Sequence, residues 1–230
     1  LTFELQDFPK FCQITNRLNV KSIADNTWAT ILGQNPLNFG IDAVIESYTK
    51  YVTGHSDVMM GGVIARNNNF RKIKNQAEIM GQCTSPDDIY LAMRGLRTME
   101  VRLEKSFASS VKVANWISKI SHVKNVFHPA TKHHPDNKIF QRDFNIGAGL
   151  FSFELSEKDP KKIDKFIDSL ELFGIGASWG GFESLVLQAD LEKIRNFESF
   201  KNSTLIRLAI GLENPDDLID DLNKAFNKLN

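Results

Sequence analysis

Short apolar runs, separated from one another by helical or irregular stretches, most constrain how this chain can fold. Residues 20–24, 41–45 and 58–65 each have the length and composition of a buried strand. Strands joined by crossovers of this kind form α/β sheets, and ligands bind at the carboxyl ends of their parallel strands. We therefore expect an α/β fold, with candidate site residues directly after these runs.

A long amphipathic helix is predicted beyond Gly95. Its apolar residues recur at three- and four-residue spacing and are Leu103, Phe107, Val111, Ala114 and Ile117. A shorter helix precedes it, with Ser85 as the cap and Pro86 in its first turn. Because long helices often connect domains, we expect a boundary near Leu96, which divides the chain into residues 1–96 and 97–230.

The second part is predicted to be a smaller two-layer α/β domain. Its expected strands are residues 123–127, 147–155, 182–187 and 205–210, and its expected helices are residues 160–172 and a final helix that Asn214 caps. Strict alternation in residues 147–155 predicts a half-exposed strand. At the other end of the chain, residues 7–18 predict a helix capped by Asp7, in which Phe11, Ile14 and Leu18 recur at helical spacing.

Charge and cysteine content narrow the classes of function. The net charge is +0, the pI is near 7.1, and no basic face is visible, so we expect no nucleic-acid partner. No apolar run approaches the length of a membrane span, and the first residues do not resemble a signal peptide. Cys12 and Cys83 lie far apart, which favours free thiols and a cytoplasmic location.

Lys50 lies among hydroxyl groups just beyond the second apolar run. Its neighbours are Thr49 and Tyr51, and Ser47 lies two residues before Thr49. A neutral lysine amine attacks an aldehyde to form an imine. In an extended segment, Ser47 and Thr49 would face the same side and could both donate to a phosphate. The alternative from the residues alone is an ordinary lysine on a strand or loop.

Asp25 ends the first apolar run and supplies a second chemical group. A carboxylate beside a pyridine nitrogen keeps that nitrogen protonated. An amine that forms an imine, together with such a carboxylate, is what pyridoxal phosphate chemistry requires of a protein. The alternative for Asp25 is a helix cap or an Asx turn.

Two later segments could bind a substrate. The sequence Ser178-Trp179-Gly180-Gly181 would let backbone approach a ligand closely, although a tight turn around a buried indole explains it as well. Arg207 lies within an apolar strand and needs a partner. That partner could be a substrate carboxylate, or a structural salt bridge could satisfy it instead.

A group of histidines is the remaining candidate for chemistry. His128, His133, His134 and Asp136 lie close in sequence, but adjacent histidines point in different directions. We therefore expect a surface loop here and no metal site.

Taken together, these motifs resemble the cysteine/methionine-metabolism family of pyridoxal phosphate enzymes, of fold type I. The residues that carry the resemblance are Asp25-Asn26-Thr27-Trp28, Thr49-Lys50-Tyr51, Gly54-His55-Ser56-Asp57, Arg94-Gly95-Leu96-Arg97-Thr98, Gly149-Leu150-Phe151-Ser152-Phe153, Ser178-Trp179-Gly180-Gly181-Phe182-Glu183-Ser184 and Ile206-Arg207-Leu208. The likeness is strongest to members that cleave cystathionine.

The resemblance implies a role for each site residue. Lys50 would form the imine with the cofactor and move the substrate proton, and Asp25 would pair with the pyridine nitrogen. Ser47 and Thr49 would hold the phosphate. Ser178, the backbone near Trp179 and Arg207 would bind the carboxylate of an amino-acid substrate. The implied reaction is β-elimination of cystathionine to homocysteine, pyruvate and ammonia, a step of trans-sulfuration and methionine biosynthesis, carried out by a homotetramer.

The resemblance also implies that the chain is N-terminally truncated, because nothing here corresponds to the first half of the family's large cofactor domain. Residues 1–96 would be the remnant of that domain, with an unpaired strand edge and an exposed apolar sheet face. Two alternatives remain open. The chain could be a non-catalytic remnant or interaction module, or it could be a γ-acting member of the family, which would release 2-oxobutyrate instead of pyruvate.

Overall fold

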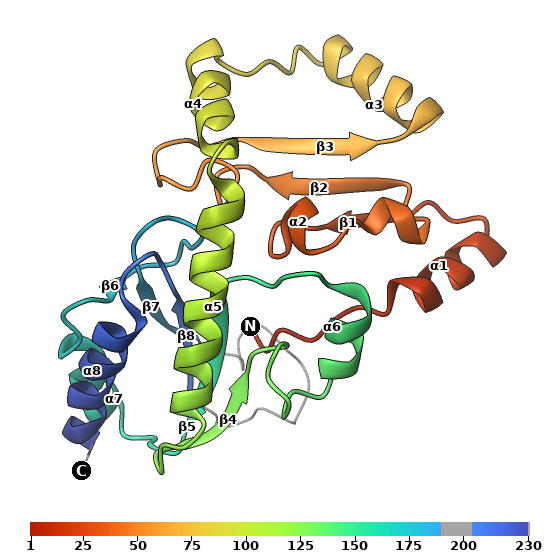
Figure 1. Cartoon of the computed structure of the whole chain (residues 1–230). Helices are drawn as coiled ribbons and strands as arrows, with labels where there is room; N and C mark the ends of the chain where they lie inside the picture. The colour runs from red at the N-terminus through yellow and green to blue at the C-terminus, as the bar shows by residue number, and fades with distance from the viewer. Residues whose placement is uncertain (190–203, 230) are drawn as a thin grey trace.

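A computed structural model of the chain describes residues 1–189 and 204–229. The chain forms two β-sheets, and the long helix α5, Met99–Ile117, runs from the first sheet, near its upper end in Figure 1, to the second sheet, beside its lower part. The first part contains α1 Phe8–Arg17, β1 Ile23–Asp25, α2 Thr30–Gly33, η1 Pro36–Phe39, β2 Ala43–Ser47, β3 Gly61–Ala65, α3 Asn67–Ile79 and α4 Pro86–Leu96. The domain boundary near Leu96 stays a prediction.

The first sheet has the strand order β1-β2-β3, with β1 parallel and β3 antiparallel to β2. Each strand starts later than its apolar run predicts: Val20, for example, lies outside β1 and is 55% exposed. In the described part of the chain, β1 pairs with β2 alone, and Ile23, Ile45 and Val63 are exposed. The expected unpaired edge and exposed apolar face are confirmed.

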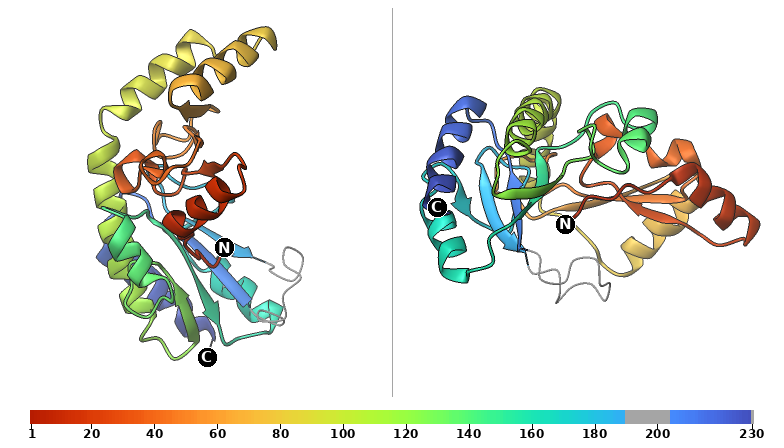
Figure 2. Two further views of the ribbon diagram at one scale, coloured as in Figure 1. Left: turned by 90° about the vertical axis from the view of Figure 1, so that its right-hand side faces the viewer. Right: turned by 90° about the horizontal axis from the view of Figure 1, so that it is seen from below.

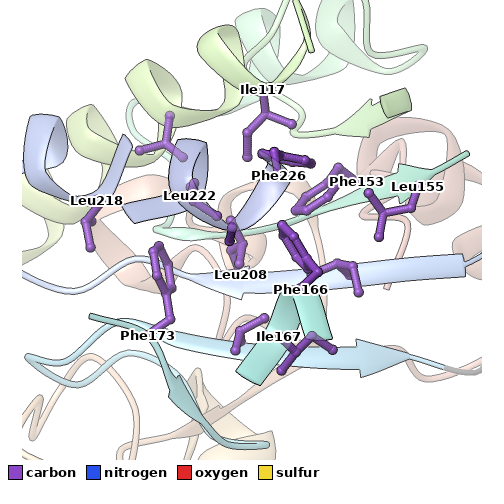
Figure 3. Close-up of a cluster of buried hydrophobic side chains, with 14 of the residues drawn as sticks. Ile117, Phe153, Leu155, Phe166, Ile167, Phe173, Leu208, Leu218, Leu222 and Phe226 are labelled. Atoms are coloured by element: carbon purple, nitrogen blue, oxygen red, sulfur yellow. The ribbon is translucent and has the colours of Figure 1, made fainter. Parts of the chain in front are cut away.

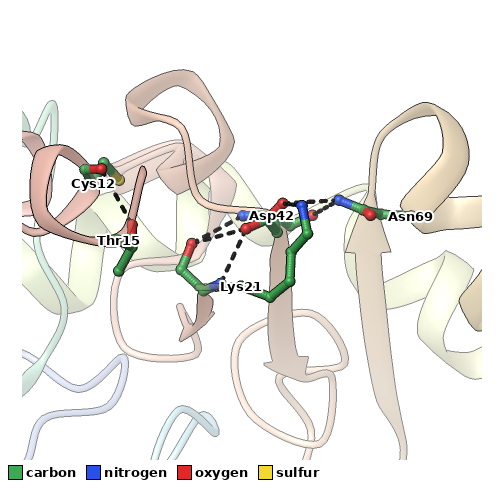
Figure 4. A network of polar contacts seen from close by, with 6 residues as sticks. Cys12, Thr15, Lys21, Asp42 and Asn69 are labelled. Carbon is green, nitrogen blue, oxygen red and sulfur yellow. Dashed lines mark hydrogen bonds and ion pairs between the residues drawn. The ribbon is translucent and has the colours of Figure 1, made fainter. Parts of the chain in front are cut away.

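A polar network explains why β1 begins at Ile23 (Figure 4). The carboxylate of Asp42 accepts hydrogen bonds from Lys21 Nζ at 2.7 Å, Ser22 N at 3.0 Å and Asn69 Nδ2 at 3.1 Å. These bonds, of which the one from Lys21 is the strongest, lower the pKa of Asp42 to about 2. The N–H of Ser22, the residue before β1, is thus bonded to the Asp42 side chain. Regular pairing of β1 with β2 therefore starts at the next residue, Ile23.

Helix α1 forms where expected, but its three regularly spaced apolar residues do not pack in the core. Phe11, Ile14 and Leu18 are all exposed, whereas Cys12 and Thr15 are buried. Cys12 joins the small core of Ala24, Ile41 and Val44. The helix is therefore rotated relative to its most apolar stripe.

The second part is built on a five-stranded sheet of order β4-β5-β8-β7-β6 (Figure 2). Its elements are β4 Val123–Phe127, α6 Asn137–Asp143, β5 Leu150–Leu155, α7 Pro160–Asp168, β6 Gly174–Ile175, β7 Leu185–Ala189, β8 Thr204–Ala209, α8 Pro215–Phe226 and η3 Asn227–Leu229. Helices α5, α7 and α8 pack on it through a core that includes Phe153, Phe166, Leu208 and Phe226 (Figure 3).

Strand β5 differs from the sequence prediction, because all six of its residues are buried. Phe151, Phe153 and Leu155 face the helices. The opposite face lies under the first part of the chain, where the Trp28 indole donates to the Leu150 carbonyl at 3.1 Å. The alternating pattern shows which residues are polar, but polarity does not determine exposure here, because the polar residues Ser152 and Glu154 are also buried.

Helix boundaries follow the caps in the sequence. Asp7, Ser85 and Asn214 each accept a backbone N–H of the first turn, as predicted. Helix α7 ends at Asp168, earlier than expected. The sequence analysis missed α3, which begins at Asn67 without a capping side chain and has no buried residue. None of the described helices combines the length and hydropathy needed to cross a bilayer.

Candidate active site

A cavity of about 520 Å³ opens where the carboxyl ends of β1 and β2 approach the second part of the chain. Four of the predicted site residues line it: Asp25, Ser47, Lys50 and Trp179. Asp25 ends β1, Ser47 ends β2, and Trp179 lies in the loop before β7. Parallel strands end at one edge of a sheet, which is why residues far apart in sequence meet here.

Lys50 lies in the turn directly after β2. Its Nζ donates to Ser178 Oγ at 2.9 Å and lies 5.4 Å from the centre of the Trp179 ring. Partial burial lowers the pKa of Lys50, and the positive charge of Arg207 lowers this pKa further. A lowered pKa increases the fraction of neutral amine, which is the nucleophilic form.

Asp25 is oriented by Thr27, a residue that the sequence analysis did not assign to the site. Asp25 Oδ1 accepts from Thr27 N at 2.9 Å and from Thr27 Oγ1 at 2.5 Å. The same Thr27 hydroxyl accepts from Ser47 N at 2.9 Å, so it joins the ends of β1 and β2. Asp25 Oδ2 accepts no hydrogen bond from the described residues. The sequence signal that could have identified Thr27 is the Asp-x-Thr turn directly after a strand.

The two predicted phosphate ligands differ in position. Ser47 lines the cavity, but Thr49 does not. The Thr49 hydroxyl donates to the Met60 carbonyl at 3.1 Å and accepts from Met60 N at 2.8 Å. A hydroxyl has one proton, so Thr49 could donate to a phosphate only after releasing Met60.

Arg207 bonds to the loop that carries Ser178. Its Nη1 donates to the Ala177 carbonyl, and its Nη2 donates to the carbonyls of Gly176 and Ser178, at 3.0–3.1 Å. Both Nη2 protons are therefore used, and a carboxylate gripped by both terminal nitrogens would have to displace a carbonyl. Arg207 Nε and the Oγ of its cross-strand neighbour Ser152 are both buried without a partner in the described structure.

Gly180 packs directly on the lysine. Its φ of +81° favours glycine, and a methyl group there would lie 3.1 Å from Lys50 Cβ. The Trp179 ring, held by this turn, packs on Tyr51 at 5.6 Å between centroids. The Trp179–Gly180 turn therefore fixes the stem of Lys50.

The histidines do not gather around a cavity. His128 and His134 are buried, and within residues 1–189 and 204–229 no three potential ligands are grouped to hold a metal ion. His128 Nδ1 accepts from Ala130 N, and its Nε2 lies 2.9 Å from Ser110 Oγ. The expected surface loop is wrong for these two residues, because each binds backbone groups inside the fold.

A second cavity, of about 420 Å³, lies on the opposite face of β2. Its lining is mostly apolar and includes Val44, Ile64 and Met99. Glu46 also lines it and is buried, which raises its pKa. None of its described lining residues is a lysine, so it lacks the amine that distinguishes the first cavity.

An α/β chain with an amine and a carboxylate at the strand ends of one cavity has the features of a pyridoxal phosphate enzyme. The sequence matches the family of Cys/Met metabolism PLP-dependent enzymes over residues 1–227. The chain therefore belongs to this family.

Three matches show the range of its relatives. A putative cystathionine beta-lyase from Rhizobium johnstonii is 40% identical, over 98% of this chain and 58% of its own length. An L-alanine/L-glutamate racemase from Wolbachia pipientis is 35% identical, over 100% of this chain and 58% of its own length. Cystathionine gamma synthase from Xanthomonas oryzae, solved with aminoacrylate and cysteine, superimposes with a TM-score of 0.92 at 29% identity, over 99% of this chain and 60% of that one.

The fold is thus the expected α/β fold of this family, and the chain spans about 60% of the length of the relatives that it matches. The residues present fit the family's cofactor in three respects. A free carboxylate oxygen of Asp25 and the Lys50 amine line one cavity, and Ser47 lines it beside them. These groups match the pyridine nitrogen, the aldehyde and the phosphate of pyridoxal phosphate.

Proposed function

We propose that this chain carries the lysine-bearing part of a pyridoxal phosphate-dependent carbon–sulfur lyase that cleaves L-cystathionine by β-elimination. The main support for the proposal is that Lys50 and Asp25 line the same cavity. When bound, pyridoxal phosphate supplies an electron sink for the substrate α-carbon. The proposal extends to the activity of the whole protein, because the relatives are longer than this chain.

Each residue has a role that follows from its contacts. Asp25 Oδ2, free among the described residues, would accept a hydrogen bond from the protonated pyridine nitrogen while Thr27 holds Oδ1. Ser47 would donate to the phosphate, and Thr49 would join it if its bond to Met60 opens. A proton transferred by a positioned side chain accelerates a reaction by about 10²–10⁴-fold. Lys50, whose amine donates to Ser178, would take the substrate α-proton.

The substrate carboxylate is assigned to the loop beside Lys50. Arg207 supplies the charge, and Ser178 supplies a hydroxyl within reach of the same region. Burial of Arg207 without a carboxylate in hydrogen-bond contact among the described residues leaves its charge available to an anion. Trp179 closes one side of the cavity.

Relatives named cystathionine beta-lyase support β-elimination over the other activities in the family. The structural match to a cystathionine gamma synthase is the observation that favours the second candidate, a γ-acting enzyme. Both candidates use the same Lys50 and Asp25 and differ in the substrate carbon that loses its sulfur.

Product analysis tests the proposal. We expect the purified chain, incubated with pyridoxal phosphate and L-cystathionine, to release pyruvate and homocysteine, and we expect Lys50→Ala to release neither. Mass spectrometry of the keto acid is the measurement. 2-Oxobutyrate would establish the γ-acting alternative. A folded chain that binds the cofactor but forms neither acid would support the non-catalytic alternative.

A further inference from the structure

Arg102 is a buried arginine with no assigned role. It lies in the first turn of α5, is 8% exposed, does not line the cavity, and bonds to the turn that follows Lys50. Its Nη2 donates to the Gly95 carbonyl at 2.7 Å and to the Val52 carbonyl at 3.3 Å, and its Nε donates to Thr98 Oγ1 at 3.1 Å. One side chain therefore joins α5, the end of α4 and the turn that carries Lys50.

The guanidinium also packs on the backbone of this turn. A methyl group at Gly54 would lie 1.8 Å from Arg102 Nη1, so only glycine leaves room for the guanidinium. Gly54 adopts a φ of +68°, and its N–H donates to the Lys50 carbonyl at 2.8 Å. Arg102 thus contacts the residue that closes the hydrogen-bonded turn of Lys50.

A second close approach supports the same turn from α4. A methyl group at Gly95 would lie 2.4 Å from the carbonyl oxygens of both Val52 and Thr53. The turn can therefore lie against Gly95 only because that residue has no side chain. Arg102 then binds two carbonyls at this contact, one from each segment.

The partners of Arg102 explain why an arginine is needed. Its bonds in the described structure go to two carbonyls and one hydroxyl, and no carboxylate forms an ion pair with it there. Burying a cation with neutral partners is costly, and such a residue persists where its geometry is required. The planar guanidinium donates in several fixed directions, which a lysine ammonium on a flexible stem does not reproduce.

We propose that Arg102 is a positioning residue that fixes the turn of residues 50–54 and thereby holds the Lys50 amine against Ser178 and Trp179. The identity of Lys50 as the reacting amine rests on the proposed function. The positioning effect does not, since it is a property of the chain without cofactor or substrate. A failure to find lyase activity would therefore leave this proposal open to its own test.

The test is the pH profile of Lys50 labelling by trinitrobenzenesulfonate, read for each lysine by peptide mass spectrometry. Lys10, whose side chain is 78% exposed, is the internal reference. In the native chain, we expect Lys50 to reach half-maximal labelling at a lower pH than Lys10. In Arg102→Met, the Lys50 midpoint should rise, because the released amine is better solvated, and labelling of Lys50 at a fixed pH below the native midpoint should slow. Arg207 is the charged group that acts on Lys50, and it is unchanged in this variant.

Matched variants separate positioning from general damage. Arg97→Met removes an exposed arginine just before α5 and should leave the midpoint unchanged. Arg102→Lys keeps the charge and should still raise the midpoint. Thr98→Val removes the acceptor of Arg102 Nε at an exposed position, and it should give a smaller shift in the same direction even if Arg102→Met fails to fold. Unchanged Lys50 midpoints in folded Arg102→Lys and Thr98→Val would overturn the proposal.

Discussion

Replacing Asp25 with asparagine is expected to weaken pyridoxal phosphate binding by about 10- to 100-fold. Asp25 Oδ2 is the free oxygen of the pair, while Oδ1 is occupied by Thr27. A hydrogen bond to a charged group is worth about 1.5–3 kcal/mol, and each 1.4 kcal/mol is a factor of ten in affinity. Asparagine keeps an oxygen for Thr27 but loses the negative charge. Titration of the purified chain with the cofactor, followed by absorbance, measures the difference.

The matched control is Asp57→Asn, since Asp57 is exposed and lies outside the cavity lining. This variant should bind the cofactor as tightly as the native chain. If Asp25→Asn also binds it normally, the carboxylate does not contact the pyridine nitrogen. The role assigned to Asp25 would then be wrong.

Acid is expected to destabilise the fold through His128. Burial lowers the pKa of His128 from 6.5 to about 3, and the nearby His134 contributes to the same shift. Its Nδ1 accepts the Ala130 N–H, so the single ring proton is on Nε2 and points to Ser110 Oγ. A second proton would remove the acceptor that Ala130 requires. The native state therefore excludes the charged imidazole.

The direction in which stability changes with pH follows from the pKa values of His128 in the folded and unfolded states. The folded value lies below the unfolded value, so the unfolded state binds the proton first as pH falls. The contribution is intact above pH 6.5 and is lost between about pH 6.5 and 3, at up to about 1.4 kcal/mol per pH unit and about 5 kcal/mol in total. Urea unfolding at a series of pH values measures it.

His128→Asn supplies the comparison, because its side-chain oxygen can still accept the Ala130 N–H and does not titrate. We expect this variant to be less stable at neutral pH but to lose less stability on acidification. His133→Asn, at the exposed neighbouring histidine, should keep the native pH dependence. Parallel curves for His128→Asn and the native chain would show that His128 is not the group responsible.

Local signals in the sequence predicted much of this fold. The caps Asp7, Ser85 and Asn214 each mark a helix start, because one side chain and one backbone N–H determine the geometry. The pairing of Asp25 with Lys50 was also predictable, since strand ends of a parallel sheet share an edge. Both inferences depend on the backbone and not on packing.

Burial could not be predicted in the same way. The exposed stripe of α1 and the buried polar residues of β5 depend on which segments pack against them, and this information is distributed over the whole chain. Thr27 and Arg102 were missed for a related reason. The bond of Thr27 with Ser47 N and the bond of Arg102 with the Val52 carbonyl each join segments distant in sequence, so no local motif contains both partners. Only the bond of Thr27 to Asp25 has a local signal, the Asp-x-Thr turn.

Borohydride reduction in the presence of pyridoxal phosphate tests the central claim most directly. Reduction makes a bond between the cofactor aldehyde and a lysine permanent, and peptide mass spectrometry locates it. The proximity of the Lys50 amine to the cavity of Asp25 predicts that Lys50 carries nearly all of the label. A label spread over the exposed lysines, with Lys50 no more modified than Lys10, would contradict the account.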